Sequence, residues 1–359
     1  MSDYLKNKKV IFVTNILGNG GAGRVMATIA NYLAHKKYNV EILSFLDNYE
    51  TYDIHNEIKN KVIYCKSKNS VLKKIERIMR LRKIIKANKE AVIISFEYFV
   101  NMQTIVATLG LKNKVIISER NDPSQQGNRF ILDKMRGLLY RFADILVCQT
   151  EDAKNYFSKE VQRKSTIILN PIMPNLPQRF VGSRKKEIVT FCRIEPQKNL
   201  KMMIDAFVLL NKEHPEYTLS IYGDGSKKEE LIEYVKSIGY IEKVNFYGFI
   251  NNIHSKIVDK AMFVSSSDYE GISNSMIEAL GIGLPSVLTD CPCGGARMII
   301  KHNENGILVP VRDTNELYKG MKKIIEDNEF SKRLSQNAEK IKYQLNEKRI
   351  CEQWIEIIL

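Results

Sequence analysis

The stretch AMFVSSSDYEGISNSMIEALGIGLPSVL, residues 261–288, begins with the apolar run 261–265 and ends with a second short run, 285–288. A segment of helical length lies between the two runs. A strand, a crossover helix and a second strand form the βαβ unit of a parallel sheet. The stretch therefore predicts an α/β fold in which helices pack on a parallel sheet.

The same alternation covers the chain on either side of this unit, and it is interrupted once. Residues 170–177 contain three prolines, which can continue neither a helix nor a central strand, so we expect a linker there. The expected strands before the linker are 10–14, 40–45, 91–96, 114–118 and 145–149. Those after it are 188–192, 218–222, 244–247, 261–265 and 285–288.

A chain of 359 residues fits two domains better than one. We expect two Rossmann-like domains, residues 1–175 and 176–335, and a final helical segment, 336–359, that packs back on the first domain. If the two domains face each other across a cleft, the carboxyl ends of both sheets meet there. These ends are where open α/β sheets bind their ligands.

The composition excludes several classes of protein. No apolar run is long enough to span a membrane, and no apolar signal region precedes the first strand, so we expect a cytoplasmic protein. Six scattered cysteines form no zinc-binding pattern and are expected to be reduced thiols, with neither metal nor cofactor. The net charge of +14 predicts an acidic partner, which is a nucleic acid, an anionic membrane or a phosphorylated substrate.

A glycine-rich turn follows the first expected strand. Gly20 and Gly21 let the backbone approach an anion, and a helix expected to begin near Val25 would add its positive N-terminal end. The turn departs from the G-x-G-x-x-G dinucleotide pattern. A plain tight turn is the other interpretation.

Two cations lie five residues apart where the second domain begins. Arg193 and Lys198 follow the strand 188–192 and precede a helix, so together they could neutralise a diphosphate. A solvated loop is the alternative. The turn at Gly223, after the next strand, fits either a nucleotide contact or simple turn chemistry.

The loop and helix of the opening stretch carry two carboxylates. Glu270 precedes the helix, the backbone N–H groups of 271–275 can point at anionic oxygens, and Glu278 lies one turn into the helix, where it can accept two bonds from a vicinal diol. The other interpretation is a capping box formed by Ser275 and Glu278, whose spacing fits one.

In this order and context, Arg193, Lys198, Glu270 and Glu278 resemble the motifs of glycosyltransferase family 4. The resemblance implies the GT-B fold and retaining sugar transfer without a metal. It assigns Arg193 and Lys198 to the donor diphosphate, Glu270 to the sugar hydroxyls and Glu278 to the ribose, with Arg193, Lys198 and Glu270 as the catalytic group. The expected donor-binding residues are Gly20, Gly21, Gly223, Gly248, Phe249, Ile250, Gly271, Ile272, Ser273, Asn274, Ser275 and Glu278.

The acceptor side departs from the family pattern. Many members place a histidine after the corresponding strand of the first domain, whereas this chain has Glu119, Arg120 and Asn121 there. The run resembles a subset that adds N-acetylhexosamine or galactose units to lipid-linked or capsular saccharides. We expect these three residues to bind the acceptor; a Glu119–Arg120 pair at the edge of the cleft is the alternative.

Residues 68–86 contain eight Lys or Arg residues and a single acid. On a helix, Lys73, Arg77 and Arg80 would share one face, while Ile75 would lie with other apolar residues on another. The basic face is expected to meet an anionic membrane or the pyrophosphate of a lipid-linked acceptor. A solvated charged face is the alternative.

These patterns together predict a retaining glycosyltransferase. It would transfer a hexose or N-acetylhexosamine from a nucleotide diphosphate sugar, expected to be a UDP-sugar, to a membrane-associated lipid-linked or cell-surface saccharide. The alternatives are a nucleotide-sugar epimerase and a nucleic-acid-binding protein. The second is disfavoured because the cations are not interleaved with aromatic residues that stack on bases.

Overall fold

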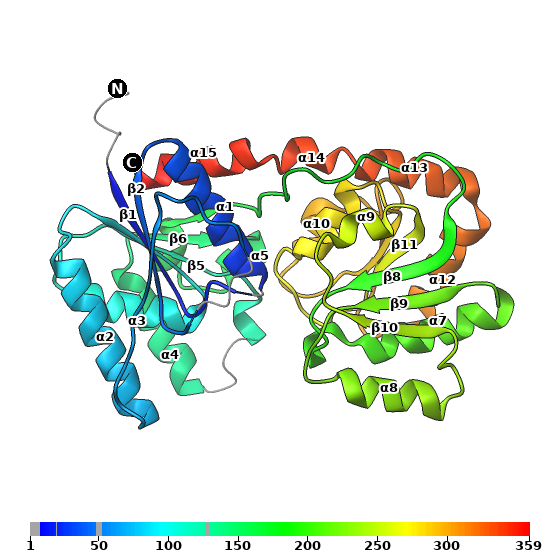
Figure 1. Cartoon of the computed structure of the whole chain (residues 1–359), viewed down its shortest axis with the longest axis horizontal. Coiled ribbons are helices and arrows are strands. Elements are labelled where there is room, and N and C mark those ends of the chain that lie inside the picture. The colour runs from blue at the N-terminus through cyan, green and yellow to red at the C-terminus, as the bar shows by residue number, and fades with distance from the viewer. Residues whose placement is uncertain (1–7, 19, 48–51, 126–129) are drawn as a thin grey trace. The chain divides into compact units, whose positions relative to one another are not determined.

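The computed structural model describes residues 8–18, 20–47, 52–125 and 130–359 (Figure 1). The chain folds as two compact units. Unit 1 comprises residues 1–171 and 347–359, and unit 2 comprises residues 172–346. None of the described helices is both long and apolar enough to cross a membrane.

Unit 1 is built on a parallel sheet with the strand order β3-β2-β1-β4-β5-β6-β7. Strands β3 and β7 were not predicted. The sequence of β3 is KNKV, which is polar because β3 is a mostly exposed edge strand, and β7 has only three residues. The strands are β1 (Lys9–Thr14), β2 (Asn39–Ser44), β3 (Lys59–Val62), β4 (Val92–Phe96), β5 (Val115–Ser118), β6 (Ile145–Cys148) and β7 (Ser165–Ile167).

Helices cover both faces of this sheet. Helices α2 and α3 bury Leu81, Ile85 and Val100 against one face, and α1 lies on the other face together with the last helix, α15 (Figure 1). The helices of unit 1 are α1 (Gly21–His35), α2 (Ser70–Lys86), α3 (Tyr98–Thr108), η1 (Pro123–Gln125), α4 (Phe130–Leu139), η2 (Tyr140–Phe142), α5 (Glu151–Asn155), α6 (Lys159–Arg163) and α15 (Glu347–Ile358).

Unit 2 is a second parallel sheet, with the strand order β10-β9-β8-β11-β12-β13. Its strands are β8 (Lys185–Phe191), β9 (Thr218–Tyr222), β10 (Val244–Gly248), β11 (Lys260–Ser265), β12 (Ser286–Thr289) and β13 (Ile307–Val309). Its helices are η3 (Pro196–Lys198), α7 (Leu200–Glu213), α8 (Lys228–Ser237), α9 (Ile253–Ile257), α10 (Asn274–Gly281), α11 (Gly295–Ile299), α12 (Thr314–Glu326), α13 (Asn328–Ala338) and α14 (Ile341–Gln344).

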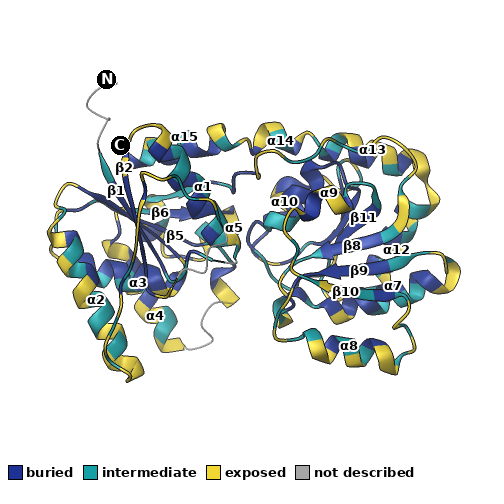
Figure 2. Cartoon of the chain, viewed as in Figure 1, coloured by how far each residue is buried: buried dark blue, intermediate teal, exposed yellow. Residues whose placement is uncertain are grey.

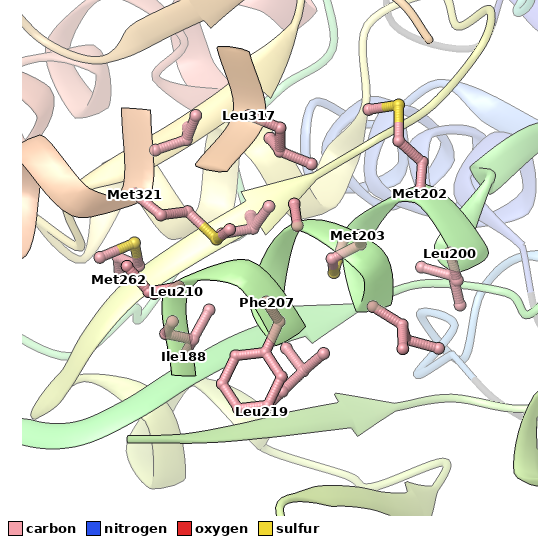
Figure 3. Close-up of a cluster of buried hydrophobic side chains, with 14 of the residues drawn as sticks. Ile188, Leu200, Met202, Met203, Phe207, Leu210, Leu219, Met262, Leu317 and Met321 are labelled. Carbon is pink, nitrogen blue, oxygen red and sulfur yellow. The ribbon is translucent and has the colours of Figure 1, made fainter. Parts of the chain in front are cut away.

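An apolar core lies between the second sheet and the helices α7 and α12 that cover one of its faces. Phe207 and Leu210 of α7 and Met321 of α12 pack onto alternate residues of the central strands, such as Leu219 and Met262 (Figure 3). Inward-facing residues recur every second position on a strand and every third or fourth on a helix. This layer anchors the strand ends that carry the functional loops.

The chain returns to unit 1 at Glu347, later than the sequence led us to expect. Residues 336–346 were expected to belong to the returning segment, but they lie in unit 2, where α14 contacts α10. Helix α15 packs on α1 and buries Trp354 completely, with its ring centroid 5.5 Å from that of Phe96. The last helix therefore completes the core of unit 1.

Replacing Trp354 with alanine should destabilise unit 1 by roughly 3–5 kcal/mol, because a fully buried tryptophan leaves both a cavity and lost apolar contacts. Urea unfolding followed by circular dichroism would measure the change. Tyr343→Ala is the control, since Tyr343 is 80% exposed. Equal stability of Trp354→Ala and Tyr343→Ala would show that α15 is not part of the core.

Candidate functional site

Two loops at the carboxyl ends of neighbouring strands form one half of the candidate site. The first leaves β8 and passes through η3 into α7, and the second leaves β11 and enters α10. Asn199 ends η3 in the left-handed conformation and caps α7 through its side chain. Asparagine tolerates this conformation better than most residues, which allows the chain to turn sharply beside Lys198.

Hydrogen bonds fasten the two loops together. The backbone N–H of Asp268 donates to the Gln197 carbonyl at 2.9 Å, and the side chain of Gln197 donates to the Tyr269 carbonyl at 2.8 Å. The Asn199 amide donates to the Asp268 carboxylate at 2.8 Å, and the Ser266 hydroxyl donates to the Lys198 carbonyl at 2.9 Å. The loops are thus held in place by groups inside unit 2.

Lys198 and Glu270 form an ion pair at the centre of these loops. Lys198 is only 8% exposed, and burial by itself would lower its pKa, but the Glu270 carboxylate outweighs burial and raises it. Arg193 is exposed and close enough to lower the pKa of Lys198 slightly. The three residues predicted to be catalytic therefore lie close together: Lys198 pairs with Glu270, and Arg193 is near enough to Lys198 to affect its pKa.

Helix α10 begins two residues earlier than a capping box formed by Ser275 and Glu278 requires. Its N-cap is Ser273, which makes no side-chain capping bond within the described part of the chain, and Ser275 lies inside the first turn. The capping-box interpretation of Ser275 and Glu278 is therefore wrong. Residues 271–275, all predicted to bind the donor, form the entry to this helix, where backbone N–H groups point outward along the helix axis.

Glu278 is buried on α10, where a histidine holds its carboxylate. Nε2 of His254, on α9, lies 2.8 Å from Oε2 of Glu278, and both residues are less than a tenth exposed. The edge of the His254 ring faces Phe191 at the end of β8. Three elements of unit 2 thus fix the position of this carboxylate.

Two other residues predicted to bind the donor, Gly223 and Gly248, contact each other through their backbones. The N–H of Gly223 donates to the Gly248 carbonyl at 2.7 Å, which joins the ends of β9 and β10. A Cβ at Gly223 would lie 1.8 Å from the Cys192 carbonyl oxygen, so glycine is required for the close approach of the loop that carries Arg193. Phe249 is exposed and Ile250 half-buried just beyond.

Gly20 and Gly21 lie in unit 1, where they open α1. The helix begins at Gly21 and not near Val25, because Gly20 takes the N-cap position in an extended conformation. The Tyr52 hydroxyl bonds both the N–H and the carbonyl of Gly20, at 3.2 and 2.9 Å. Asn19, part of the same predicted turn, lies outside the described residues.

Glu119 lies in the interior of unit 1. It is 1% exposed and accepts a hydrogen bond from the Tyr140 hydroxyl, and the guanidinium of Arg136 lies 3.9 Å away. Burial raises the pKa of Glu119 to about 7, although Arg136 and Tyr140 oppose the shift. These contacts with Tyr140 and Arg136 anchor the loop that follows β5.

Arg120 and Asn121 extend from that anchor. Arg120 donates to Asn170 and lies over the Phe96 ring, 4.8 Å from its centroid, and burial lowers its pKa to about 9. The alternative prediction, an ion pair between Glu119 and Arg120, is wrong. Glu119 instead contacts Arg136 and Tyr140, and Arg120 donates a hydrogen bond to Asn170. Asn121 is half-buried beside them.

Helix α2 presents a different face from the one expected. Arg77 bonds the Phe45 carbonyl at 3.3 Å, Arg80 pairs with Glu76 at 2.7 Å, and Lys73 is half-buried. Ile75, expected on the apolar face of the helix, is 48% exposed, because the fully buried residues of α2 are Leu81 and Ile85. The first two turns extend past the core.

The sequence analysis did not identify several residues that hold the loops and carboxylates of the site in position. Gln197 and Asn199 join the loops, and Asn199 directly before an amphipathic segment is a recognisable capping signal. His254 lies 24 residues from Glu278, and no local pattern connects the two. Its role depends on how α9 and α10 pack together.

Similarities to known protein families cover both units of the chain. The model of "Glycosyltransferase Family 4" matches residues 19–176, and that of "Glycosyl transferases group 1" matches residues 176–341. The chain is similar to an α-1,4-N-acetyl-D-galactosaminyltransferase of Campylobacter jejuni, with 30% identity over 98% of both chains. The name of that relative gives its acceptor as GalNAc-α-(1→4)-GalNAc-α-(1→3)-diNAcBac-PP-undecaprenol.

Further similarities extend over nearly the whole chain. A second C. jejuni relative, an N-acetylgalactosaminyltransferase whose name carries a diphospho-undecaprenol acceptor, is 29% identical over 90% of this chain and 91% of its own. Anabaena HepE, solved with UDP and glucose, superposes with a TM-score of 0.83 at 18% identity, covering 98% of this chain and 99% of its own. TarM gives a TM-score of 0.81 at 14% identity over 99% of both chains. The fold is GT-B.

The buried Glu119 predicts a pH-dependent stability of unit 1. In the folded protein its carboxyl stays protonated up to about pH 7, whereas in the unfolded chain it ionises near 4.5. Folding therefore retains a proton between these values, and stability should fall as pH rises from 4.5 through 7. Glu119→Gln, neutral at every pH, should remove this part of the dependence.

Urea unfolding at several pH values, followed by fluorescence, would measure the effect, because Trp354 is the single tryptophan and lies in unit 1. Glu90→Gln, at an exposed position, is the matched control. A constant difference between wild type and Glu119→Gln across this range would contradict the assignment.

Proposed function

Because the chain belongs to glycosyltransferase family 4, we propose that this glycosyltransferase moves a hexose or N-acetylhexosamine from a UDP-sugar to a lipid-linked saccharide with retention of configuration. The observation that carries the proposal is the ion pair of buried Lys198 with half-buried Glu270, near exposed Arg193 and before the entry to α10. The two cations and the helix entry are suited to the charge of a diphosphate.

In the donor complex, the diphosphate lies against Arg193 and Lys198. Lys198 already holds its charge in a buried position, so it can stabilise the negative charge that grows on the leaving phosphate without reorganisation of solvent. Glu270 is then released from part of its ion pair and accepts hydrogen bonds from the sugar hydroxyls. Glu278, oriented by His254, accepts hydrogen bonds from the ribose.

The proposed reaction needs no side-chain nucleophile, metal or cofactor. The bond between the anomeric carbon and the phosphate oxygen breaks as the acceptor hydroxyl forms its bond on the same face of the sugar. The leaving phosphate oxygen accepts the proton of that hydroxyl, so the products are a retained glycoside and UDP. Arg193 and Lys198 supply the positive charge that a divalent cation supplies in other enzymes.

The acceptor assignment draws on the relatives. Two similar C. jejuni enzymes carry undecaprenol-linked acceptors in their names, and a structural neighbour, HepE, was solved with UDP. We assign Arg120 and Asn121 to the acceptor side, held in position by buried Glu119.

A panel of UDP- and GDP-sugars, each incubated with and without a lipid-linked saccharide acceptor, tests the proposal. The expected result is UDP release that depends on the acceptor, together with a product whose anomeric configuration by NMR matches that of the donor. Interconversion of sugars without acceptor would instead identify a nucleotide-sugar epimerase. An inverted product would exclude the proposed mechanism.

Lys198→Ala should lower kcat by about 100- to 1000-fold, which corresponds to roughly 3–4 kcal/mol in the barrier, because one stabilising charge at the leaving group is lost. Lys201→Ala, an exposed lysine three residues along that pairs with Asp205, should leave kcat unchanged. Steady-state kinetics with the preferred donor would compare the two variants. Wild-type turnover of Lys198→Ala would refute its role.

A further inference from the structure

Helix α4 has its polar and apolar sides reversed relative to an ordinary surface helix. One of its three charged residues, Arg136, is fully buried, and Phe130, Ile131, Met135 and Leu138 are 72%, 71%, 48% and 56% exposed. At about 100° per residue, the four exposed apolar side chains fall within roughly 140° of the helix circumference. A water-facing helix normally places its charges on this side.

The buried side of α4 fixes the exposed side in place. The Arg136 guanidinium donates to the Pro123 carbonyl at 2.8 Å, the Tyr156 hydroxyl at 2.8 Å and the Asp133 carboxylate at 3.1 Å. The same guanidinium also lies over the Tyr98, Tyr156 and Phe157 rings. Rotating α4 to hide its apolar residues would break these bonds and move Arg136 away from its buried partners.

The apolar surface continues along this end of unit 1. Parallel strands are joined by helices that run back, so α2, α3 and α4 all begin at the carboxyl edge of the sheet. Helix α3 packs against both α2 and α4, and Figure 2 marks exposed residues on α2 and α4. All three helices expose apolar side chains in their first turns. These are Val71 and Leu72 on α2, Phe99 on α3, and Phe130 and Ile131 on α4.

Positive charge borders the apolar side chains. Lys74 and Lys134 are exposed among them. The acid on α2, Glu76, is paired with Arg80, and the acid on α4, Asp133, is paired with Arg136. The surface therefore presents lysines that remain uncompensated by the acids of its own helices, as expected of a face that meets anionic headgroups.

We propose that the exposed apolar side of α4, together with the first turns of α2 and α3, forms a membrane-docking surface that inserts apolar side chains into an anionic lipid bilayer. This inference rests on the proposed function, since a lipid-linked acceptor lies in a membrane. The loop with Arg120 and Asn121 follows β5 at the same carboxyl edge of the sheet. Docking by this surface brings the membrane to the edge of unit 1 assigned to the acceptor.

Vesicle flotation tests the surface. The wild-type protein should bind vesicles of phosphatidylglycerol and phosphatidylethanolamine, and bind phosphatidylcholine vesicles more weakly. The double variant Ile131→Glu with Leu138→Glu should lose binding at least tenfold, and Lys74→Ser with Lys134→Ser should lose only the preference for anionic lipid. Tyr343→Glu, at an exposed position of α14 in unit 2, should bind as wild type does.

A second measurement separates this inference from the proposed function. Transfer to a water-soluble acceptor without a lipid tail should be unchanged in the double variant, whereas transfer to a vesicle-embedded acceptor should fall. Unaltered vesicle binding by the double variant overturns the docking surface. A wild-type dimer that the double variant dissociates also overturns it, because a second copy then covers this face. Vesicle binding without any sugar transfer leaves the surface in place and refutes the proposed function.

Discussion

The candidate site of unit 2 depends on one ion pair, in which Lys198 is buried and Glu270 is half-buried. An ammonium group removed from water needs a nearby opposite charge, and Glu270 provides it for Lys198. The two residues belong to loops that follow different strands, so the pair also joins the ends of β8 and β11. The hydrogen bonds of Gln197, Asn199 and Ser266 hold the two loops at the distance that the pair requires.

The same arrangement gives the site its proposed chemistry. A paired lysine is already desolvated before the substrate arrives, so little reorganisation is needed when a phosphate takes over part of its charge. Glu278 is prepared in the same way, since His254 fixes its carboxylate before any hydroxyl group binds. In the proposed function, this arrangement prepares unit 2 for a ligand with a diphosphate and a vicinal diol. The buried polar contacts of Glu119 give the loop after β5 in unit 1 a comparable support.

Much of this organisation could be predicted from the sequence, because its signals are local. Strand periodicity located the central strands, and the order and spacing of Arg193, Lys198, Glu270 and Glu278 led to the prediction of a shared site, of which the structure shows the Lys198–Glu270 pair. Strand β3 was missed because an exposed edge strand has no apolar alternation. The support of Glu278 by His254 was missed because it arises from the packing of α9 on α10.

The exposed faces of the helices were the least predictable features. Ile75 fits a helical apolar stripe, but the turns before Ile78 extend beyond the core, so the stripe faces solvent there. Arg136 shows the opposite departure: it is a charged residue, yet the fold buries it among aromatic rings. Periodicity shows that a helix has two faces, and tertiary packing decides which of them is covered.

The most direct test of the account is a crystal structure of the protein with a bound UDP-sugar. The account predicts the diphosphate within hydrogen-bonding distance of Arg193 and Lys198, the sugar hydroxyls at Glu270, and the ribose hydroxyls at Glu278 with the His254 contact retained. A nucleotide bound elsewhere, or a diphosphate that leaves the Lys198–Glu270 pair untouched and distant, would contradict it.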